Sequence, residues 1–108
     1  MNLPLKNSNR TMNLLTKTCL KNVPPLYAQD GKNDDAIVHL KFFYGGWTWF
    51  LLELDQNTGQ AFGKVKSPFC PEGEYGYFDM NELAKFNQYG MAIERDKYWK
   101  PCRIGNIK

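Results

Sequence analysis

The sequence predicts a single small α+β domain, with an antiparallel sheet of four to five strands and two short helices packed on it. Stretches rich in β-branched and aromatic residues alternate with glycine-containing turns, which is typical of hairpins. Two other stretches begin with capping side chains and carry apolar residues at helical spacing. The expected strands are residues 36–44, 47–55, 60–66, 74–78 and a last one at 91–99.

The length and composition indicate one domain. A chain of 108 residues with 43% apolar and 15% aromatic residues can bury a core of its own. The first residues are polar and lack periodicity, so we expect a flexible N-terminal tail over residues 1–11 and one domain over 12–108. Thr11 is the expected N-cap of a helix over residues 12–21, with Cys19 on its apolar stripe.

The stretch 47–66 is the centre of the predicted sheet, because it holds two of the three tryptophans and forms two strands around a glycine turn. Gly45 and Gly46 are expected to join it to the preceding strand by a two-residue hairpin. Side chains alternate along a strand. The two faces of the central strand therefore carry Trp49, Leu51 and Glu53 on one side and Phe50, Leu52 and Leu54 on the other.

The register across the Gly-Gly hairpin decides which residues join each face. A regular hairpin places Val38, Leu40 and Phe42 on the Trp49 face, and His39 and Lys41 on the Phe50 face. A one-residue bulge would exchange the two sets, and the sequence leaves both possibilities open. Both faces are apolar, so we expect one to pack on a helix and the other to be partly covered by aromatic side chains and the chain termini.

The second half of the chain is expected to continue the sheet and add a helix. Residues 67–73 contain two prolines and are predicted to be a loop. Gly76 is expected to mark a close approach within its strand. Asp79, followed three residues later by a glutamate, predicts a capped helix that ends near Gly90, and Pro101 ends the last strand.

No metal site or cofactor is predicted. The acidic loop at residues 29–35 lacks the glycine and the closing glutamate of a calcium-binding EF-hand, and is expected to be a solvated loop. Cys19, Cys70 and Cys102 are widely spaced and odd in number, which indicates reduced thiols. The common nucleotide, hydrolase and metalloprotease motifs are absent from the sequence.

The charge and hydropathy pattern favours a cytoplasmic protein with no membrane segment. The formal net charge is +3, and the basic residues are scattered along the chain, so nucleic acid is only a weakly supported partner. No apolar run reaches the length of a signal peptide or of a membrane span of roughly 20 residues.

Four residues are candidates for catalysis. His39 is the only histidine, so any histidine-based site must include it. Glu53 and Asp55 lie two residues apart on one strand and could divide acid and base roles. Arg95 lies between two acids, where it either serves such a site or forms a structural bridge to carboxylates. We favour the structural interpretation and a protein that is not an enzyme.

A surplus of aromatic side chains on one sheet face would mark a partner site. The same face, with Lys64 and Lys66 nearby, could instead stack single-stranded nucleic acid. The candidate interaction residues are Trp47, Trp49, Glu53, Asp55, Phe62, Lys64, Glu94, Arg95 and Asp96.

Eight short motifs follow one another along the chain: V-P-P-L-Y (residues 23–27), K-F-F (41–43), W-T-W-F (47–50), E-L-D (53–55), A-F-G-K-V-K (61–66), E-Y-G-Y-F (74–78), N-E-L (81–83) and I-E-R-D-K-Y-W-K-P (93–101). In this order they resemble a small uncharacterised bacterial family, labelled domain of unknown function 2958, and the resemblance covers about residues 12 to 101. The chain departs from the family pattern at Ala92 and in the loop at residues 67–73.

The resemblance implies a genetic context and no assigned catalytic residues. Proteins of this family are typically encoded on plasmids, phages and integrated elements, sometimes near antirestriction genes. We therefore expect a small interaction protein that binds a protein partner and inhibits or modulates a host defence or DNA-processing complex. The alternatives are a small enzyme or ligand-binding domain using Glu53, Asp55, Arg95 and His39, and a single-stranded nucleic-acid binder.

Overall fold

The computed structural model describes residues 14–86, 90 and 92–107, so the expected tail over residues 1–11 lies outside the described part. Five antiparallel strands in the order β5-β4-β3-β2-β6 form the main sheet, and β1 pairs with β7 in a separate two-stranded sheet. The elements are α2 (Lys17–Leu20), η1 (Asn33–Asp35), β1 (Ile37–Val38), β2 (Leu40–Tyr44), β3 (Trp47–Leu54), β4 (Gln60–Ser67), β5 (Cys70–Asp79), α3 (Met80–Phe86), β6 (Glu94–Arg95), β7 (Cys102–Arg103) and η3 (Ile104–Asn106).

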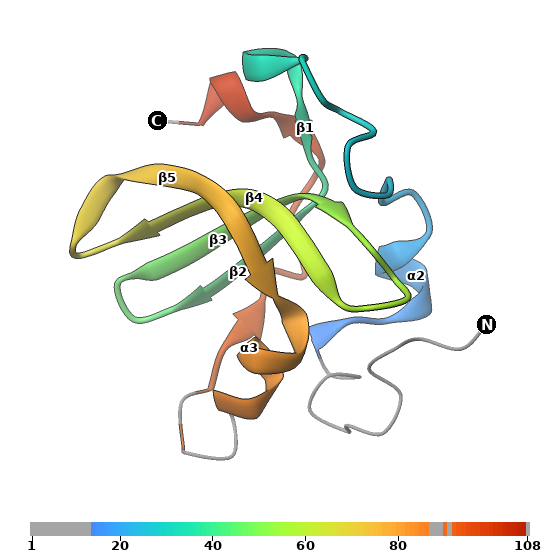
Figure 1. Cartoon of the computed structure of the whole chain (residues 1–108). Helices are drawn as coiled ribbons and strands as arrows, with labels where there is room; N and C mark the ends of the chain where they lie inside the picture. The colour runs from blue at the N-terminus through green and yellow to red at the C-terminus, as the bar shows by residue number, and fades with distance from the viewer. Residues whose placement is uncertain (1–13, 87–89, 91, 108) are drawn as a thin grey trace.

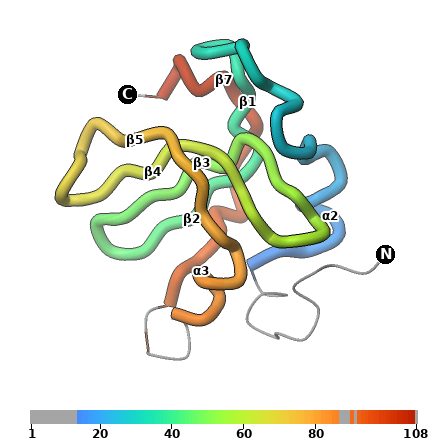
Figure 2. The backbone as a smooth tube through the Cα atoms, viewed as in Figure 1, coloured from blue at the N-terminus to red at the C-terminus, as the bar shows by residue number. Residues whose placement is uncertain are grey.

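The arrangement is a small domain, mostly sheet with short helices, which agrees with the predicted fold class. Figure 1 shows α3 following β5 at one end of the sheet, with β1 and the C-terminal segment at the opposite end. The tube in Figure 2 shows β7 running beside β1. The radius of gyration of 13.0 Å is that of a compact chain of about this length.

Two tight hairpins set the register of the main sheet. Tyr44 pairs with Trp47 around Gly45–Gly46, so the predicted two-residue hairpin is confirmed, and of the two registers that the sequence left open the regular one is present. Ser67 pairs with Cys70 around a second turn, so the prediction of a loop at residues 67–73 was wrong. The prolines are tolerated because Pro68 lies in the turn and Pro71 lies on β5, an edge strand where one row of N–H groups has no neighbouring strand to bond.

Each face of the sheet is covered, as expected. One face, which we call the helix face, carries Phe42, Trp49 and Leu51 and packs on α3 and on the buried Leu14 and Leu15. The other, which we call the outer face, has its own cluster, formed by Ala36, Val38, Phe50, Leu52 and Ile104, with Trp99, Phe62 and Ile107 packed against it. The C-terminal segment therefore covers part of the outer face.

Val38 lies on the outer face, although a regular hairpin was predicted to place it beside Trp49. The strand is interrupted at His39, which separates β1 from β2, and the alternation does not continue across that break. The backbone N–H of His39 donates to the carbonyl of Leu51, so the chain stays attached to β3 while its direction changes. Leu40 and Phe42 lie on the helix face, as expected for a regular hairpin.

A β-bulge in β3 changes the face of the last residues of that strand. Leu51 pairs with Gly63 and Glu53 pairs with Phe62, so β3 advances by two residues where β4 advances by one. Leu54 joins the core of the helix face, and Glu53 turns to the outer face. The prediction that Glu53 and Trp49 share a face was therefore wrong, because alternation holds only in an unbulged strand.

The close approach within the sheet occurs at Gly63, the cross-strand partner of Gly76. A Cβ atom at Gly63 would overlap the carbonyl oxygen of Phe50, whereas nothing lies within 4 Å of a Cβ atom at Gly76. The close approach was predicted at Gly76 of β5 but occurs at its partner Gly63 of β4, so the predicted position was wrong. The tight contact at Gly63 lies directly beside the bulge.

The helix α2 is shorter than the helix predicted over residues 12–21. Thr16 is the N-cap of α2: its hydroxyl accepts a hydrogen bond from the N–H of Cys19 at 3.1 Å, so the helix begins at Lys17. The predicted cap Thr11 lies outside the described residues. Asp79 caps α3 as expected, through the N–H of Asn81 at 2.8 Å, and α3 ends at Phe86. Its predicted end, near Gly90, follows residues 87–89, which are outside the described part.

The last strand is reduced to β6, which pairs with Phe42 and Phe43 of β2. It ends because Asp96 forms a local turn in which its Oδ1 accepts a hydrogen bond from the N–H of Tyr98 at 3.0 Å. An aspartate side chain that bonds its own backbone two residues on replaces the ladder with a turn. The predicted strand over residues 91–99 is thus too long.

Candidate functional site

The predicted interaction residues lie in several separate places. Glu53 and Phe62 line a cavity on the outer face, where Lys64 lies nearby, and Trp47 and Trp49 line another cavity on the helix face. Arg95 and Asp96 line a third, and Glu94 is exposed on β6. Asp55 lies in the turn after β3, where its Oδ1 accepts a hydrogen bond from the N–H of Asn57 at 2.8 Å. The residues therefore do not form a single site.

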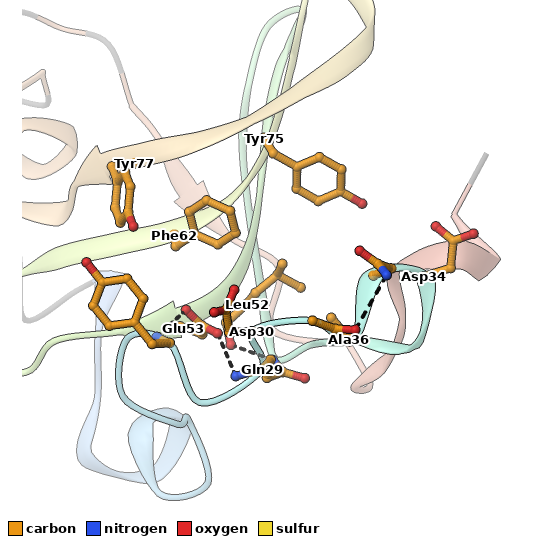
Figure 3. Close-up of a pocket in the computed structure, with 12 residues that line it drawn as sticks. Gln29, Asp30, Asp34, Ala36, Leu52, Glu53, Phe62, Tyr75 and Tyr77 are labelled. Atoms are coloured by element: carbon orange, nitrogen blue, oxygen red, sulfur yellow. Dashed lines mark hydrogen bonds between the residues drawn. The ribbon is translucent and has the colours of Figure 1, made fainter.

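The cavity on the outer face combines aromatic rings with carboxylates, and we call it the tyrosine cavity. Its volume is about 470 Å³, within the range of roughly 300–1,000 Å³ of ligand sites. Figure 3 shows Tyr77, Phe62 and Tyr75 along one side and Asp30, Ala36 and Asp34 along the other. The remaining lining residues are Tyr27, Gln29, Gly31, Asn33, Leu52 and Glu53.

Strand pairing positions the aromatic side of the tyrosine cavity. Glu53 of β3, Phe62 of β4 and Tyr77 of β5 are direct cross-strand neighbours. Tyr75 lies two residues before Tyr77, so both tyrosines project from the same face of β5. Because the bulge in β3 brings Glu53 into this row, the carboxylate lies beside the aromatic rings.

Glu53 anchors the loop that forms the other side. Glu53 is buried, with only 4% of its surface exposed. Its two carboxylate oxygens accept hydrogen bonds from the backbone N–H groups of Tyr27 at 2.8 Å and Gln29 at 2.7 Å. Tyr27 has a φ angle of 72°, in the left-handed region that is costly for a bulky residue. The carboxylate of Glu53 therefore stabilises an unusual backbone conformation at the cavity wall.

Gln29 ties the same loop to two strands. Its Oε1 accepts a hydrogen bond from the N–H of Ile37 at 2.6 Å. Its Nε2 donates to the carbonyls of Ile37 and Leu52, each at 2.9 Å. Leu52 lies at the bulge of β3 and Ile37 lies in β1, so one buried amide group holds the loop, the bulge and the small sheet together.

The rings of the aromatic side contact one another. Phe62 stacks with Tyr75 at a centroid distance of 6.3 Å and lies 5.1 Å from Tyr77 in a tilted arrangement. A hydrogen bond to the Tyr27 side chain raises the pKa of Tyr77, with smaller contributions from Glu53 and Asp30. Burial, and then the charge of Asp34, raise the pKa of Tyr75. These tyrosines therefore stay neutral, within a field of negative charge.

The third cavity, of about 480 Å³, contains His39, Arg95 and Asp96 but neither Glu53 nor Asp55. The Arg95 Nε donates to the carbonyl of Leu14 at 2.9 Å, and Asp96 lies 3.9 Å from the Lys41 ammonium. Burial lowers the pKa of His39. His39 and Arg95 thus line one cavity, Glu53 lines another and Asp55 lies in a turn, so the four residues proposed for a catalytic site do not share a single cavity.

Trp47 and Trp49 differ in exposure. Trp49 is 8% exposed and belongs to the core of the helix face. Trp47 is 37% exposed, stacks on Trp49 at 5.9 Å and meets the ring of Phe69 edge-on at 6.4 Å. Together with α3 they line a cavity of about 350 Å³. Trp49 is therefore unsuitable as a surface probe, because its replacement would disturb the core.

Sequence reasoning missed the loop residues of the tyrosine cavity, Tyr27, Gln29, Asp30 and Asp34. One signal was available: Glu53 is a charged residue within an otherwise apolar strand, and a buried carboxylate needs donors from elsewhere in the chain. The spacing of Tyr75 and Tyr77 was a second signal, since residues two apart share a face. Neither signal identifies which loop completes the site.

Fold and site together define the class: a small α+β domain, mainly antiparallel sheet, with an aromatic and acidic cavity on one face. The family described as "Protein of unknown function (DUF2958)" matches residues 10–104. The chain therefore belongs to this family, as its motifs indicated. No curated protein and no solved structure matches the chain.

Within residues 14–86, 90 and 92–107, no helix is long and apolar enough to cross a membrane. No group of three or more histidine, cysteine, aspartate or glutamate side chains there is placed to hold a metal ion.

Proposed function

We propose that the protein is a non-enzymatic interaction module that holds a protein partner at the tyrosine cavity. The observation that supports this most directly is the exposure of its three tyrosines: Tyr27 is 66%, Tyr75 50% and Tyr77 51% exposed around one cavity. Tyrosine is enriched at protein interfaces, because its ring supplies apolar area and its hydroxyl supplies a hydrogen bond.

The arrangement of Glu53 favours binding over catalysis. Each oxygen of Glu53 accepts a hydrogen bond from a backbone N–H group of the loop, which is the contact pattern of a structural anchor. The carboxylate is thus held in one orientation as part of the cavity wall. Such preorganisation lowers the entropic cost of binding a partner.

The partner that we propose belongs to a host defence or DNA-processing complex, and the protein would inhibit or modulate that complex. Support comes from the family resemblance, which implies plasmids, phages and integrated elements as the genetic context. The protein's small size and preformed cavity fit a role that depends on occupying a surface.

Affinity capture from a lysate of the encoding organism tests the proposed surface. The wild type, a Tyr75→Ser/Tyr77→Ser variant and a Tyr98→Ser control are immobilised in parallel; Tyr98 is 92% exposed and lines none of the cavities described above. We expect a protein retained by the wild type and by the control, and lost with the double variant. Equal retention by all three proteins would show that the tyrosine cavity is not the docking surface.

A second candidate function is binding of single-stranded nucleic acid on the outer face, over a row of rings that begins at Tyr75 of the tyrosine cavity. There Lys64 lies over the ring of Tyr75 at 5.5 Å, Lys66 over Phe50 at 5.8 Å and Lys41 over Trp99 at 5.6 Å. Lysines interleaved with aromatic rings are the elements of a stacking platform.

Fluorescence polarisation with a labelled oligonucleotide of about ten nucleotides tests this candidate. A Lys64→Ala/Lys66→Ala variant should bind more weakly than a control with Lys85→Ala, since Lys85 lies on α3. The affinity should also fall with added salt. Affinity that is insensitive to the two lysines would refute the candidate.

A further inference from the structure

We propose that the tyrosine cavity binds an arginine side chain of the protein partner. This inference rests on the proposed function, and it names the chemical group that the cavity recognises. Three observations support it: the negative charge of the cavity lining, the remaining acceptor positions of the Glu53 carboxylate, and the row of aromatic rings beside that carboxylate.

The lining of the cavity is negatively charged, although the chain as a whole carries a formal charge of +3. Asp30, Asp34 and Glu53 line the cavity, and its lining includes no lysine, arginine or histidine. The raised pKa values of Tyr75 and Tyr77 have contributions from these same carboxylates. A cationic group therefore complements the site, and an anionic group would be repelled.

Glu53 retains capacity to bind such a cation. A carboxylate offers about four acceptor positions on its two oxygens, and backbone N–H groups occupy one position on each. In the described part of the chain, Lys41 pairs with Asp96 and Arg103 with Asp35, and neither pair supplies Glu53 with a counter-charge. A buried carboxylate gains strongly from a cationic partner.

The aromatic side selects a planar cation. Guanidinium groups stack on aromatic rings and donate two parallel hydrogen bonds to a carboxylate, while an ammonium group is compact and more strongly hydrated. Tyr75, Phe62 and Tyr77 form a row of rings beside Glu53. The Lys64 ammonium lies 5.5 Å from the centre of the Tyr75 ring, so one ring of this row already makes a cation–π contact.

The test is an NMR titration of the full, isotope-labelled chain with three peptides. They are acetyl-Gly-Arg-Gly-amide, the same peptide with citrulline, which is neutral and nearly isosteric with arginine, and the same peptide with lysine. We expect the arginine peptide to shift the backbone amide signals of Tyr27 and Gln29 and to bind about tenfold tighter than the citrulline peptide, or about 1.4 kcal/mol. The lysine peptide should bind more weakly than the arginine peptide.

Variants at the rim test the charge without disturbing the buried carboxylate. Asp30 and Asp34 are exposed, so an Asp30→Asn/Asp34→Asn variant should fold normally and bind the arginine peptide several-fold more weakly. Glu72→Gln, at an exposed position of β5 outside the cavity lining, is the matched control and should bind like the wild type.

The inference is overturned by equal affinity for arginine and citrulline, by lysine binding as tightly as arginine, or by the absence of binding up to about 10 mM peptide. An unchanged preference in the Asp30/Asp34 variant overturns it as well. If capture of the partner still depends on Tyr75 and Tyr77 in any of these cases, the proposed function stands and only the arginine is wrong. Arginine binding without tyrosine-dependent capture would instead refute the docking surface.

Discussion

Replacement of Gln29 by leucine should strongly destabilise the protein, although the two side chains have similar volumes. The substitution removes three hydrogen bonds, of 2.6, 2.9 and 2.9 Å, from a residue that is 8% exposed. Each bond contributes about 0.5–1.5 kcal/mol net, and a buried group left without a partner costs about 1–3 kcal/mol. Because Leu fills the space, little cavity cost is added, and we expect a loss of roughly 2–4 kcal/mol.

The measurement is urea unfolding followed by tryptophan fluorescence. A domain of this kind has a free energy of unfolding of about 5–15 kcal/mol, so the expected loss would clearly lower the midpoint. Gln60→Leu is the matched control, since Gln60 is exposed at the start of β4, and it should change the free energy by no more than about 0.5 kcal/mol. If Gln29→Leu were as mild as its control, the buried amide would not hold the loop, the bulge and β1 together.

Three further predictions concern the sheet, the histidine and the second helix. Gly63→Ala should lower the free energy of unfolding by more than about 3 kcal/mol or prevent folding, because its Cβ atom would overlap the Phe50 carbonyl. Gly76→Ala has open space around it and should stay within about 0.5 kcal/mol of the wild type. Equal melting temperatures of the two variants by circular dichroism would contradict this contrast. Burial lowers the pKa of His39 below its ordinary value of 6.5, so the unfolded state binds the proton more readily, and the free energy of unfolding should fall as the pH drops below about 6.5. Urea unfolding at a series of pH values should give a flatter profile for His39→Gln, and an identical profile would refute the assignment. Asp79→Ala removes the cap of α3 and should cost about 1 kcal/mol, while Asp79→Asn should recover most of that loss; similar losses in both variants would show that the cap does not matter.

The local features of the fold were predictable because neighbouring residues determine them. Gly45–Gly46 forms the expected two-residue hairpin, and Asp79 caps the expected helix. In both cases a few backbone angles and one side chain decide the outcome. The apolar character of both sheet faces, and hence their cover by helix and by C-terminal segment, also followed from the alternation in β3.

The loop prediction at residues 67–73 failed for a reason that lies outside the segment. Proline is excluded from a central strand but accepted at an edge, and only the strand order places β5 at the edge of the sheet. The sequence of residues 67–73 does not indicate which strands will lie beside it. Its conformation therefore depended on tertiary information.

The candidate site depended on tertiary structure even more. The sequence by itself determined that Glu53 is a charged residue in an apolar strand and that Tyr75 and Tyr77 share a face of theirs. The bulge in β3 decided that Glu53 faces these tyrosines and lies away from Trp49. The loop that supplies Gln29 completed the site.

The physical reason for this difference is the separation along the chain between the residues that interact. Alternation and capping are set within a few residues, so the sequence determined the central strands, the Gly45–Gly46 hairpin and the cap of α3. A bulge is stabilised by partners on other elements, here the Gln29 amide that donates to the Leu52 carbonyl across 23 positions of the chain. Only the folded structure brings these groups together, and only there does the tyrosine cavity exist.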